Sequence, residues 1–310
     1  MKVCSLFSGI GGFDQGFIDA GFEIVWANDI DEYAVETYKA NYDTPIVCKD
    51  LNEVDLDDIP NFDVLIGGFP CQPFSMMGAQ KGFDDARGTC FFRIAELIDN
   101  KIKKGYAPKA IVLENVRAIK KHDNGKTFAT IQRILEEMGY SVFSNILNSA
   151  DYGVPQTRNR TFIVCFKDKN IKYEFPKAIK LEKYLQDILE TDVQEKYFLS
   201  DKILKTIMSS GTGGYYGKSE IDLKIARPLC ATMAKMHRAC QDNYVTQKGR
   251  IRRLTPRECA RLQGFKDSFI IPVSDCQAYK QFGNAVTVNV SSAVAKSVLL
   301  ALNTDEGRCK

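Results

Sequence analysis

The sequence lacks most features that would set it apart from ordinary globular proteins. Its ten cysteines include no Cys-x-x-Cys pair, and a chain of 310 residues can bury a core without disulfides. No apolar run approaches the ~18–20 residues that a membrane span needs. The glycines from Gly9 onward come too early for the core of a signal peptide. These absences predict a cytoplasmic protein with reduced thiols and no membrane partner.

A recognisable metal site is also missing. Cys230, His237 and Cys240 are the only close grouping of suitable ligands that we find in the sequence, and their spacing matches no common zinc pattern. We therefore predict no bound metal.

Strong net charge is absent too, because the formal charge is only +3. Eight cations nevertheless gather between residues 235 and 261, against Asp242 and Glu258 alone: Lys235, Arg238, Lys248, Arg250, Arg252, Arg253, Arg257 and Arg261. Such a stretch is a plausible phosphate-binding surface, and a solvated basic face explains it equally well.

The first half of the chain alternates between apolar runs typical of strands and segments typical of helices. We expect strands at 2–7, 22–28, 46–47, 64–67, 110–114, 140–148 and 161–166, and helices up to Ala20 and at 31–41, 126–138 and 286–302. This alternation predicts an α/β fold with a doubly wound, mostly parallel sheet. The last two strands are close in sequence, which favours an antiparallel edge. Residues 170–249 have weak periodicity and indicate a smaller, irregular domain.

A glycine turn follows the first expected strand and opens a helix, as in many ligand sites. The spacing is Gly9-x-Gly11-Gly12, and Asp14 stands where a dinucleotide enzyme would have its third glycine. Asp29 ends the second strand, where a carboxylate can accept hydrogen bonds from ribose hydroxyls, and Asp50 lies beyond the third. The pattern favours a nucleoside cofactor without a pyrophosphate.

A second group of reactive side chains follows later strands. Cys71 lies in a Gly- and Pro-rich loop after the fourth strand, at the edge where doubly wound sheets bind ligands. Glu114 ends the next strand. Arg158 and Arg160 then alternate at the entrance of a later strand, which predicts that both point to one face. A salt-bridged edge strand would also explain these arginines.

Six ordered motifs resemble those of the DNA (cytosine-5) methyltransferases, especially the compact bacterial restriction–modification type. They are FSGIGGFDQGF, GGFPCQPFS, ENV, QTRNR, RRLTPRECARLQGF and QFGNAV. The resemblance implies a Rossmann-like fold dependent on S-adenosylmethionine, with a catalytic, cofactor-binding domain at 1–180 and 276–310. It also implies a target-recognition domain at 181–255 and a hinge segment at 256–275.

The resemblance implies a role for each matching residue. Cys71 would add to C6 of a flipped-out cytosine, Glu114 would contact N3 and Arg160 would hold O2. Arg158 belongs to the same catalytic motif, with a structural or phosphate-facing role. The cofactor would contact Phe7, Gly9, Gly11, Gly12, Asp29, Ile30, Asp50, Leu51, Pro70 and Asn284. Double-stranded DNA would contact Gln72, Ser75, Thr232 and Arg238.

The glycines between Ser75 and Gly88 suit a closing lid, although a passive surface loop would also contain them. We expect the loops around residues 211–217 and 235–250 to recognise the DNA target sequence. We expect a monomer, and the sequence leaves open whether a cognate restriction endonuclease acts on the same site without forming a stable complex.

Three other functions remain to be weighed. A tRNA cytosine-5 methyltransferase would share the chemistry, but Pro73-Phe74-Ser75 fits the DNA enzymes better. A nicotinamide-dependent dehydrogenase would share the sheet, but Asp14 interrupts its fingerprint. A non-catalytic DNA-binding regulator would have no need of Cys71 and Glu114.

Overall fold

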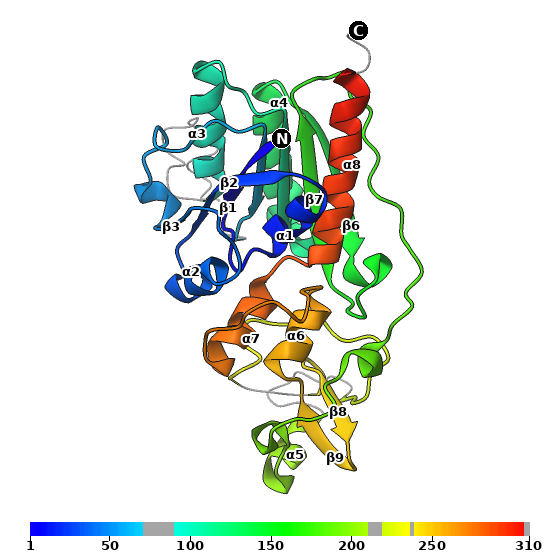
Figure 1. Cartoon of the computed structure of the whole chain (residues 1–310). Coiled ribbons are helices and arrows are strands. Elements are labelled where there is room, and N and C mark those ends of the chain that lie inside the picture. Colours follow the sequence, from blue (N-terminus) through cyan, green and yellow to red (C-terminus); the bar gives the residue numbers. More distant parts are fainter. Residues whose placement is uncertain (71–89, 210–218, 236–238, 307–310) are drawn as a thin grey trace. The chain divides into compact units, whose positions relative to one another are not determined.

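The computed structural model describes residues 1–70, 90–209, 219–235 and 239–306, and for Asp305 and Glu306 it describes the backbone alone. The chain divides into two compact units (Figure 1). Unit 1 comprises Met1–Leu147, Asn159–Lys177 and the chain from Val290 onward, and unit 2 comprises Asn148–Arg158 and Ala178–Asn289. The functional domain boundaries expected from the sequence stay a prediction.

Unit 1 is built on a seven-stranded sheet with the order β3-β2-β1-β4-β5-β7-β6. Its strands are β1 (Lys2–Leu6), β2 (Glu23–Asp29), β3 (Ile46–Cys48), β4 (Val64–Gly68), β5 (Ala110–Val116), β6 (Ser141–Asn148) and β7 (Asn159–Phe166). The pairs from β3 to β5 are parallel, and β7 is antiparallel to β5. The predicted α/β sheet with an antiparallel edge is confirmed.

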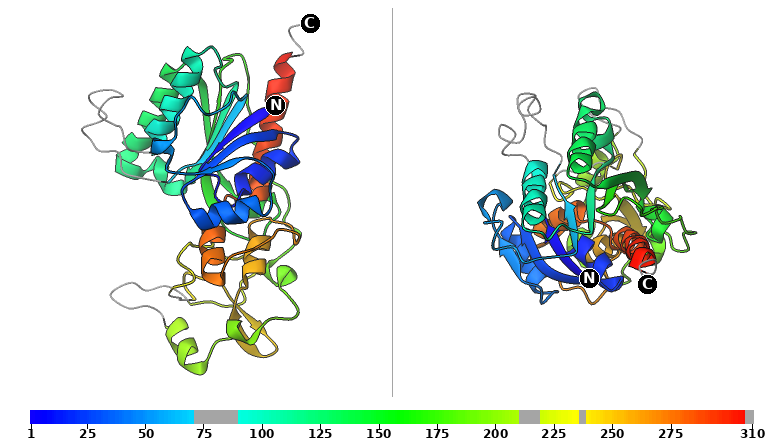
Figure 2. Two further views of the ribbon diagram at one scale, coloured as in Figure 1. Left: turned by 60° about the vertical axis from the view of Figure 1, so that its left-hand side comes forward. Right: turned by 90° about the horizontal axis from the view of Figure 1, so that it is seen from above.

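Helices cover both faces of this sheet. They are α1 (Gly12–Asp19), α2 (Glu32–Lys39), α3 (Cys90–Lys103), α4 (Lys126–Glu137) and α8 (Val288–Glu306). Figures 1 and 2 show α3 and α4 on one face, with α1 and α8 on the other. Because both faces are covered, central strands read as nearly continuous apolar runs, and the first six residues of β5 are all buried.

Unit 2 has little regular structure. It contains α5 (Asp201–Ile207), the antiparallel hairpin of β8 (Tyr244–Gln247) and β9 (Arg250–Arg253), α6 (Pro256–Leu262) and α7 (Asp275–Asn284). A fully buried ion pair joins Arg252 to Glu258 at 2.7 Å and so links the hairpin to α6.

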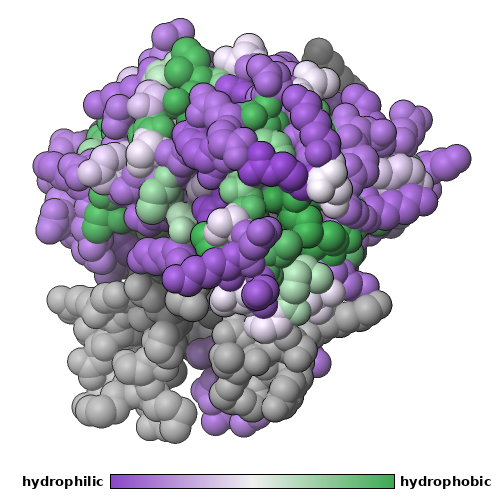
Figure 3. Space-filling view, turned by 90° about the horizontal axis from the view of Figure 1, so that it is seen from below, coloured by the Kyte–Doolittle hydropathy of each residue, from purple (hydrophilic) through white to green (hydrophobic). Residues whose placement is uncertain are grey.

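Figure 3 shows one face of the molecule, where hydrophilic side chains cover most of the coloured surface.

One expectation about apolar runs is wrong. The helical stretch Asp275–Thr304 contains a window that is long and apolar enough to cross a membrane. Half of that window is buried inside the protein, as in the core helix of a globular fold. We therefore attribute its apolar character to packing in the core. The length and composition of one such helix are only weak evidence for a membrane span.

The contact between α1 and α8 depends on a glycine. A Cβ added to Gly16 would lie 2.3 Å from the Ser291 Oγ and 2.5 Å from the Ser292 backbone nitrogen. Ser291 also donates a hydrogen bond of 2.7 Å to the carbonyl of Phe13. The side-chain-free position lets α8 approach the helix that follows the glycine turn.

We therefore predict that Gly16→Ala destabilises the protein by about 1–3 kcal/mol, the usual cost of overpacking. Chemical denaturation measures this change. The control is Glu36→Ala on exposed α2 surface, expected within about 0.5 kcal/mol of the unsubstituted chain. Equal stability of both variants would contradict the close packing of α1 against α8.

Candidate active site

The glycine turn after β1 has an unusual backbone. Phe7, Gly9 and Gly11 all have left-handed conformations, with φ of 53°, 55° and 80°. Such a φ is strained for a bulky residue like Phe7, and strain of this kind concentrates at functional sites. The Gly9 N–H donates a 2.7 Å hydrogen bond to Oδ2 of Asp29. The carboxylate predicted to bind ribose therefore also holds the turn.

Glycine is required at position 11 for a steric reason as well as for its left-handed backbone conformation. A Cβ there would lie 2.3 Å from the Tyr42 ring, whose hydroxyl donates to the Gly11 carbonyl at 3.1 Å. By contrast, a Cβ on Gly9 would meet nothing within 4 Å. The turn thus packs firmly on one side and leaves open space beside Gly9. Gly12, the last predicted glycine, is buried as the first residue of α1.

Asp29 and Asp50 follow neighbouring strands at the same sheet edge. Asp29 pairs in register with Cys48, and its Oδ1 accepts a 2.8 Å bond from the Asp31 N–H. Burial raises the pKa of Asp29, while the backbone hydrogen bonds oppose that rise. Asp50 accepts from the Asn52 N–H at 2.9 Å and caps a short 3₁₀ helix.

Two apolar residues predicted to bind cofactor differ in access. Ile30 is 65% exposed beside Asp29, whereas Leu51 is buried. Asn28, which the sequence did not single out, donates to the carbonyls of Val47 and Lys49 at 3.1 and 2.9 Å. This buried amide fixes the chain that leads to Asp50.

Sequence reasoning also missed the role of Asp14 beneath the glycine turn. Its side chain is fully buried and accepts hydrogen bonds of 2.9 Å from the Ser5 and Tyr38 hydroxyls. Ser8, next to Gly9, donates onward to Ser5 at 2.9 Å. Burial raises the Asp14 pKa to about 6, although both side-chain hydrogen bonds lower it. The sequence did contain a signal for this network, because a carboxylate on the buried side of a largely apolar helix needs hydrogen-bond partners.

The carboxyl ends of β4 and β5 lie side by side, with Gly68 opposite Glu114. Asn115 is buried and donates a 2.8 Å hydrogen bond to the carbonyl of Phe69. Pro70 follows and is exposed. Cys71, Gln72, Ser75 and the predicted lid fall outside the described residues.

Glu114 and Arg160 form the charged pair of this edge. The Arg160 Nε lies 3.1 Å from Oε1 of Glu114, because β7 runs antiparallel to β5 with Arg160 opposite Val116. The Glu114 side chain is only 10% exposed and that of Arg160 is 21% exposed. The structure therefore brings together two of the predicted catalytic residues in a largely dry position.

Arg158 has different surroundings. Arg158 lies just before β7, which begins at Asn159. The alternation along a strand, which predicted that Arg158 and Arg160 point to the same face, therefore does not apply to it. Its guanidinium donates to backbone carbonyls of unit 2, and the residue is 2% exposed. Asn284 and Thr232, also in unit 2, are both exposed.

The basic stretch is not one phosphate-facing surface. Arg252 is fully buried in its pair with Glu258, Arg250 pairs with Glu195 at 2.5 Å, and Arg261 pairs with Asp267 at 2.7 Å. Arg252 cannot face phosphate, because no part of it reaches the surface. Arg238 falls outside the described residues.

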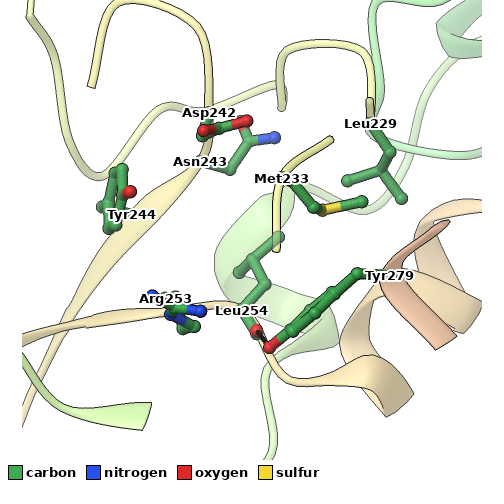
Figure 4. A pocket seen from close by; sticks show the side chains of 8 residues that line it. All are labelled: Leu229, Met233, Asp242, Asn243, Tyr244, Arg253, Leu254 and Tyr279. Carbon is green, nitrogen blue, oxygen red and sulfur yellow. Dashed lines mark hydrogen bonds between the residues drawn. The ribbon is translucent and has the colours of Figure 1, made fainter. Parts of the chain in front are cut away.

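Unit 2 also has a small, mainly apolar pocket beside the hairpin (Figure 4). Leu229, Met233 and Leu254 line it together with Tyr279, whose hydroxyl donates to the Leu254 carbonyl at 2.6 Å. Within the described part of the chain, no three His, Cys, Asp or Glu side chains are grouped as metal ligands.

The raised pKa of Asp14 predicts a pH-dependent stability. Between about pH 4 and pH 6 the folded chain keeps a proton on Asp14 that the unfolded chain has lost, so this stabilisation is present at low pH and is lost as the pH rises through about 6. From pH 5 to pH 8 the free energy of unfolding should fall by roughly 1 kcal/mol more than that of Asp14→Asn. Urea denaturation of both proteins measures the difference. If the free energies of unfolding of the two proteins differed by the same amount at pH 5 and at pH 8, the expected protonation of Asp14 at low pH would be contradicted.

Comparison with known proteins identifies the family. The model of the C-5 cytosine-specific DNA methylases matches residues 1–299. The Type II methyltransferase M.NlaX of Neisseria lactamica is 40% identical and covers 99% of both chains. M.HhaI of Haemophilus parahaemolyticus, also a Type II methyltransferase, is 36% identical over 98% of this chain and 95% of its own.

Solved structures agree in fold. The Dnmt2 methyltransferase of S. pombe superposes with a TM-score of 0.81 at 22% identity, covering 98% of this chain and 99% of its own. The Entamoeba histolytica methyltransferase EhMeth gives 0.79 at 22% identity, covering 97% and 98%. The family model and the Type II relatives both extend over nearly the whole chain, and the chain therefore belongs to the C-5 cytosine-specific DNA methylase family.

Proposed function

We propose that this enzyme transfers a methyl group from S-adenosylmethionine to C5 of a flipped-out cytosine in duplex DNA. The observation that carries the proposal is the Glu114–Arg160 pair at the end of β5, beside the strand that leads into Pro70 and Cys71. This edge combines a carboxyl group and a cation, and the sequence places a thiol directly after the strand beside it, as addition to a pyrimidine requires. The Type II relatives favour DNA over tRNA, and an enzyme over a non-catalytic regulator.

Cys71 is the proposed nucleophile. Cytosine C5 becomes nucleophilic only after a group adds to C6 and converts the ring to an enamine. The Cys71 thiolate would form the bond to C6, C5 would then take up the methyl group, and loss of the C5 proton would expel Cys71 and restore aromaticity. A free thiol is only a few per cent ionised at neutral pH, so the loop must stabilise the anion.

Glu114 and Arg160 have complementary proposed roles. Glu114 would donate a proton or hydrogen bond to N3 as the thiolate adds, which stabilises the charge that develops on the ring. Arg160 would hold O2 of the same base. Their 3.1 Å pairing supports these roles, since N3 and O2 are neighbours on one edge of cytosine and two groups this close can reach both.

The glycine-turn edge suits an adenosine-containing cofactor. The open space beside Gly9, the exposed apolar Ile30 and the Asp29 carboxylate fit an adenosine group, and these residues would hold it with Phe7, Gly11, Gly12, Asp50, Leu51, Pro70 and Asn284. When bound, S-adenosylmethionine supplies an electrophilic methyl group on a sulfonium.

Unit 2 residues are the proposed readers of DNA, following the target-recognition domain expected at 181–255. In this unit Thr232 would contact a phosphate and Arg238 a base or phosphate. Gln72 and Ser75, which precede unit 2 in the sequence, would contact the strand near the flipped base. We further propose a monomeric, cytoplasmic enzyme of a restriction–modification system, with a cognate endonuclease recognising the same site.

Transfer of tritiated methyl groups tests the function directly. The protein should label unmethylated duplex DNA and leave tRNA unlabelled, and bisulfite sequencing of host DNA should then show one recurrent modified cytosine. Labelling of tRNA alone would transfer the proposal to the RNA-modifying branch.

Covalent trapping tests the role of Cys71. Duplex DNA with 5-fluorocytosine in the mapped site should remain attached to the protein after denaturation, because fluorine at C5 cannot leave as a proton does. Gel electrophoresis of the denatured complex measures the adduct. Cys71→Ala should form none, whereas Cys276→Ala, which removes an exposed thiol of α7, should trap normally. Methyl transfer by Cys71→Ala at the normal rate would rule out the mechanism.

The role of Glu114 predicts a specific kinetic defect. Glu114→Gln keeps the shape but cannot donate a carboxylic acid proton, so kcat should fall about 10²-fold or more, the usual contribution of general acid catalysis. The KM for the cofactor should hardly change. Glu137→Gln, in an exposed pair with Arg133 on α4, is the matched control and should retain full turnover. An unchanged kcat in Glu114→Gln would contradict proton donation.

A further inference from the structure

The guanidinium of Arg158 lies in an unusual polar site inside unit 2. Nη1 donates to the carbonyl of Leu229, and Nη2 donates to the carbonyls of Gly283 and Ala285, each at 3.0 Å. The residue is 2% exposed. Arginine suits this task because its planar fork holds several acceptors in fixed directions. One side chain thus joins two segments that are more than fifty residues apart in sequence.

Both segments lead to residues with proposed roles in binding. Gly283 and Ala285 flank Asn284, whose side chain is exposed, and Leu229 lies three residues before exposed Thr232. A Cβ on Gly283 would lie 2.3 Å from the Ala231 nitrogen. The two backbones are therefore in direct contact, and Arg158 joins them at this contact.

Buried glutamines support the same junction. Gln156 accepts a 2.8 Å bond from the Leu229 N–H and donates to the Leu262 carbonyl at 2.8 Å. Gln263 donates to the carbonyls of Phe282 and Ala285 at 2.5 and 3.3 Å. The end of α7 around Asn284 is thus held from two sides, and Arg158 bonds both to it and to the Leu229 segment.

We propose that Arg158 is a positioning residue that sets the end of α7 around Asn284 and the Leu229–Thr232 segment in one geometry, so that cofactor and DNA binding both depend on it. This inference rests on the proposed function, through the roles given there to Asn284 and Thr232. Replacement by lysine would keep the charge but leave buried carbonyls without donors, which displaces both segments.

Steady-state kinetics of Arg158→Lys on S-adenosylmethionine and duplex DNA test the proposal. The KM for each substrate should rise about tenfold, while kcat changes less than about threefold, because binding groups and not reacting groups are displaced. A double-mutant cycle with Asn284→Ala adds a readout that general destabilisation would not give. In the Asn284→Ala background, Arg158→Lys should raise the cofactor KM by less than about twofold.

Arg252→Lys is the matched control, since Arg252 is a fully buried arginine of the same unit. It should lower the thermal unfolding temperature and leave both KM values unchanged. Unchanged KM values in an active Arg158→Lys enzyme, or an equal rise in Arg252→Lys, would overturn the inference alone. Absence of methyl transfer by the unsubstituted chain would overturn the proposed function and the inference with it.

A second variant covers the case in which Arg158→Lys does not fold. Gln156→Met removes the acceptor for the Leu229 N–H and the donor to the Leu262 carbonyl, and it leaves the bonds of Arg158 to Gly283 and Ala285. The KM for DNA should rise severalfold and the cofactor KM should stay the same. No change in the KM for DNA, or an equal rise in both constants, would overturn the proposal.

Discussion

The in-register pairing of β4 with β5 is the constraint on which the candidate site depends. Gly68 lies opposite Glu114, so the chain leaving β4 emerges beside the strand that carries the proposed acid. Asn115 then anchors that chain through the Phe69 carbonyl. A slip of one residue would turn every side chain of a fully buried strand to the opposite face, which the packing of this sheet forbids. Core packing therefore sets the spacing of the reactive groups, and local contacts only refine it.

The sheet of unit 1 could be predicted because its buried strands are short apolar runs between turn residues. The glycine turn indicated the sheet edge at which we propose that the cofactor binds. Helix α3 was not predicted, although Phe91, Ile94, Ala95 and Ile98 form a buried stripe along it. Its start follows the glycine-containing segment that was interpreted as a lid. The Asp14 network escaped notice because its partners Ser5 and Tyr38 come from two other elements, and sequence spacing does not reveal such meetings.

Unit 2 resisted prediction for a related reason. Its stability depends on side chains that bond to distant backbone, such as Gln247 to the Glu190 carbonyl, and on the buried Arg252–Glu258 pair. None of these contacts has a period that a sequence pattern could show. The basic stretch illustrates the consequence, since a run of arginines suggests a nucleic-acid surface while Arg252 in fact lies in the core.

Arg158 and Arg160 show how far two similar residues can diverge. Arg158 directs its donors to neutral backbone carbonyls, so these contacts do not depend on the protonation state of a partner. Arg160 instead faces the Glu114 carboxylate, with its Nε 3.1 Å from Oε1. In the proposed mechanism Glu114 must hold a proton for N3. In the same proposal, a base that binds Arg160 through O2 would compete with Glu114 for that guanidinium, whereas the carbonyl partners of Arg158 have no such competitor. The proposed catalytic role of Arg160 thus needs a partner that can be exchanged, and the proposed positioning role of Arg158 needs partners that stay.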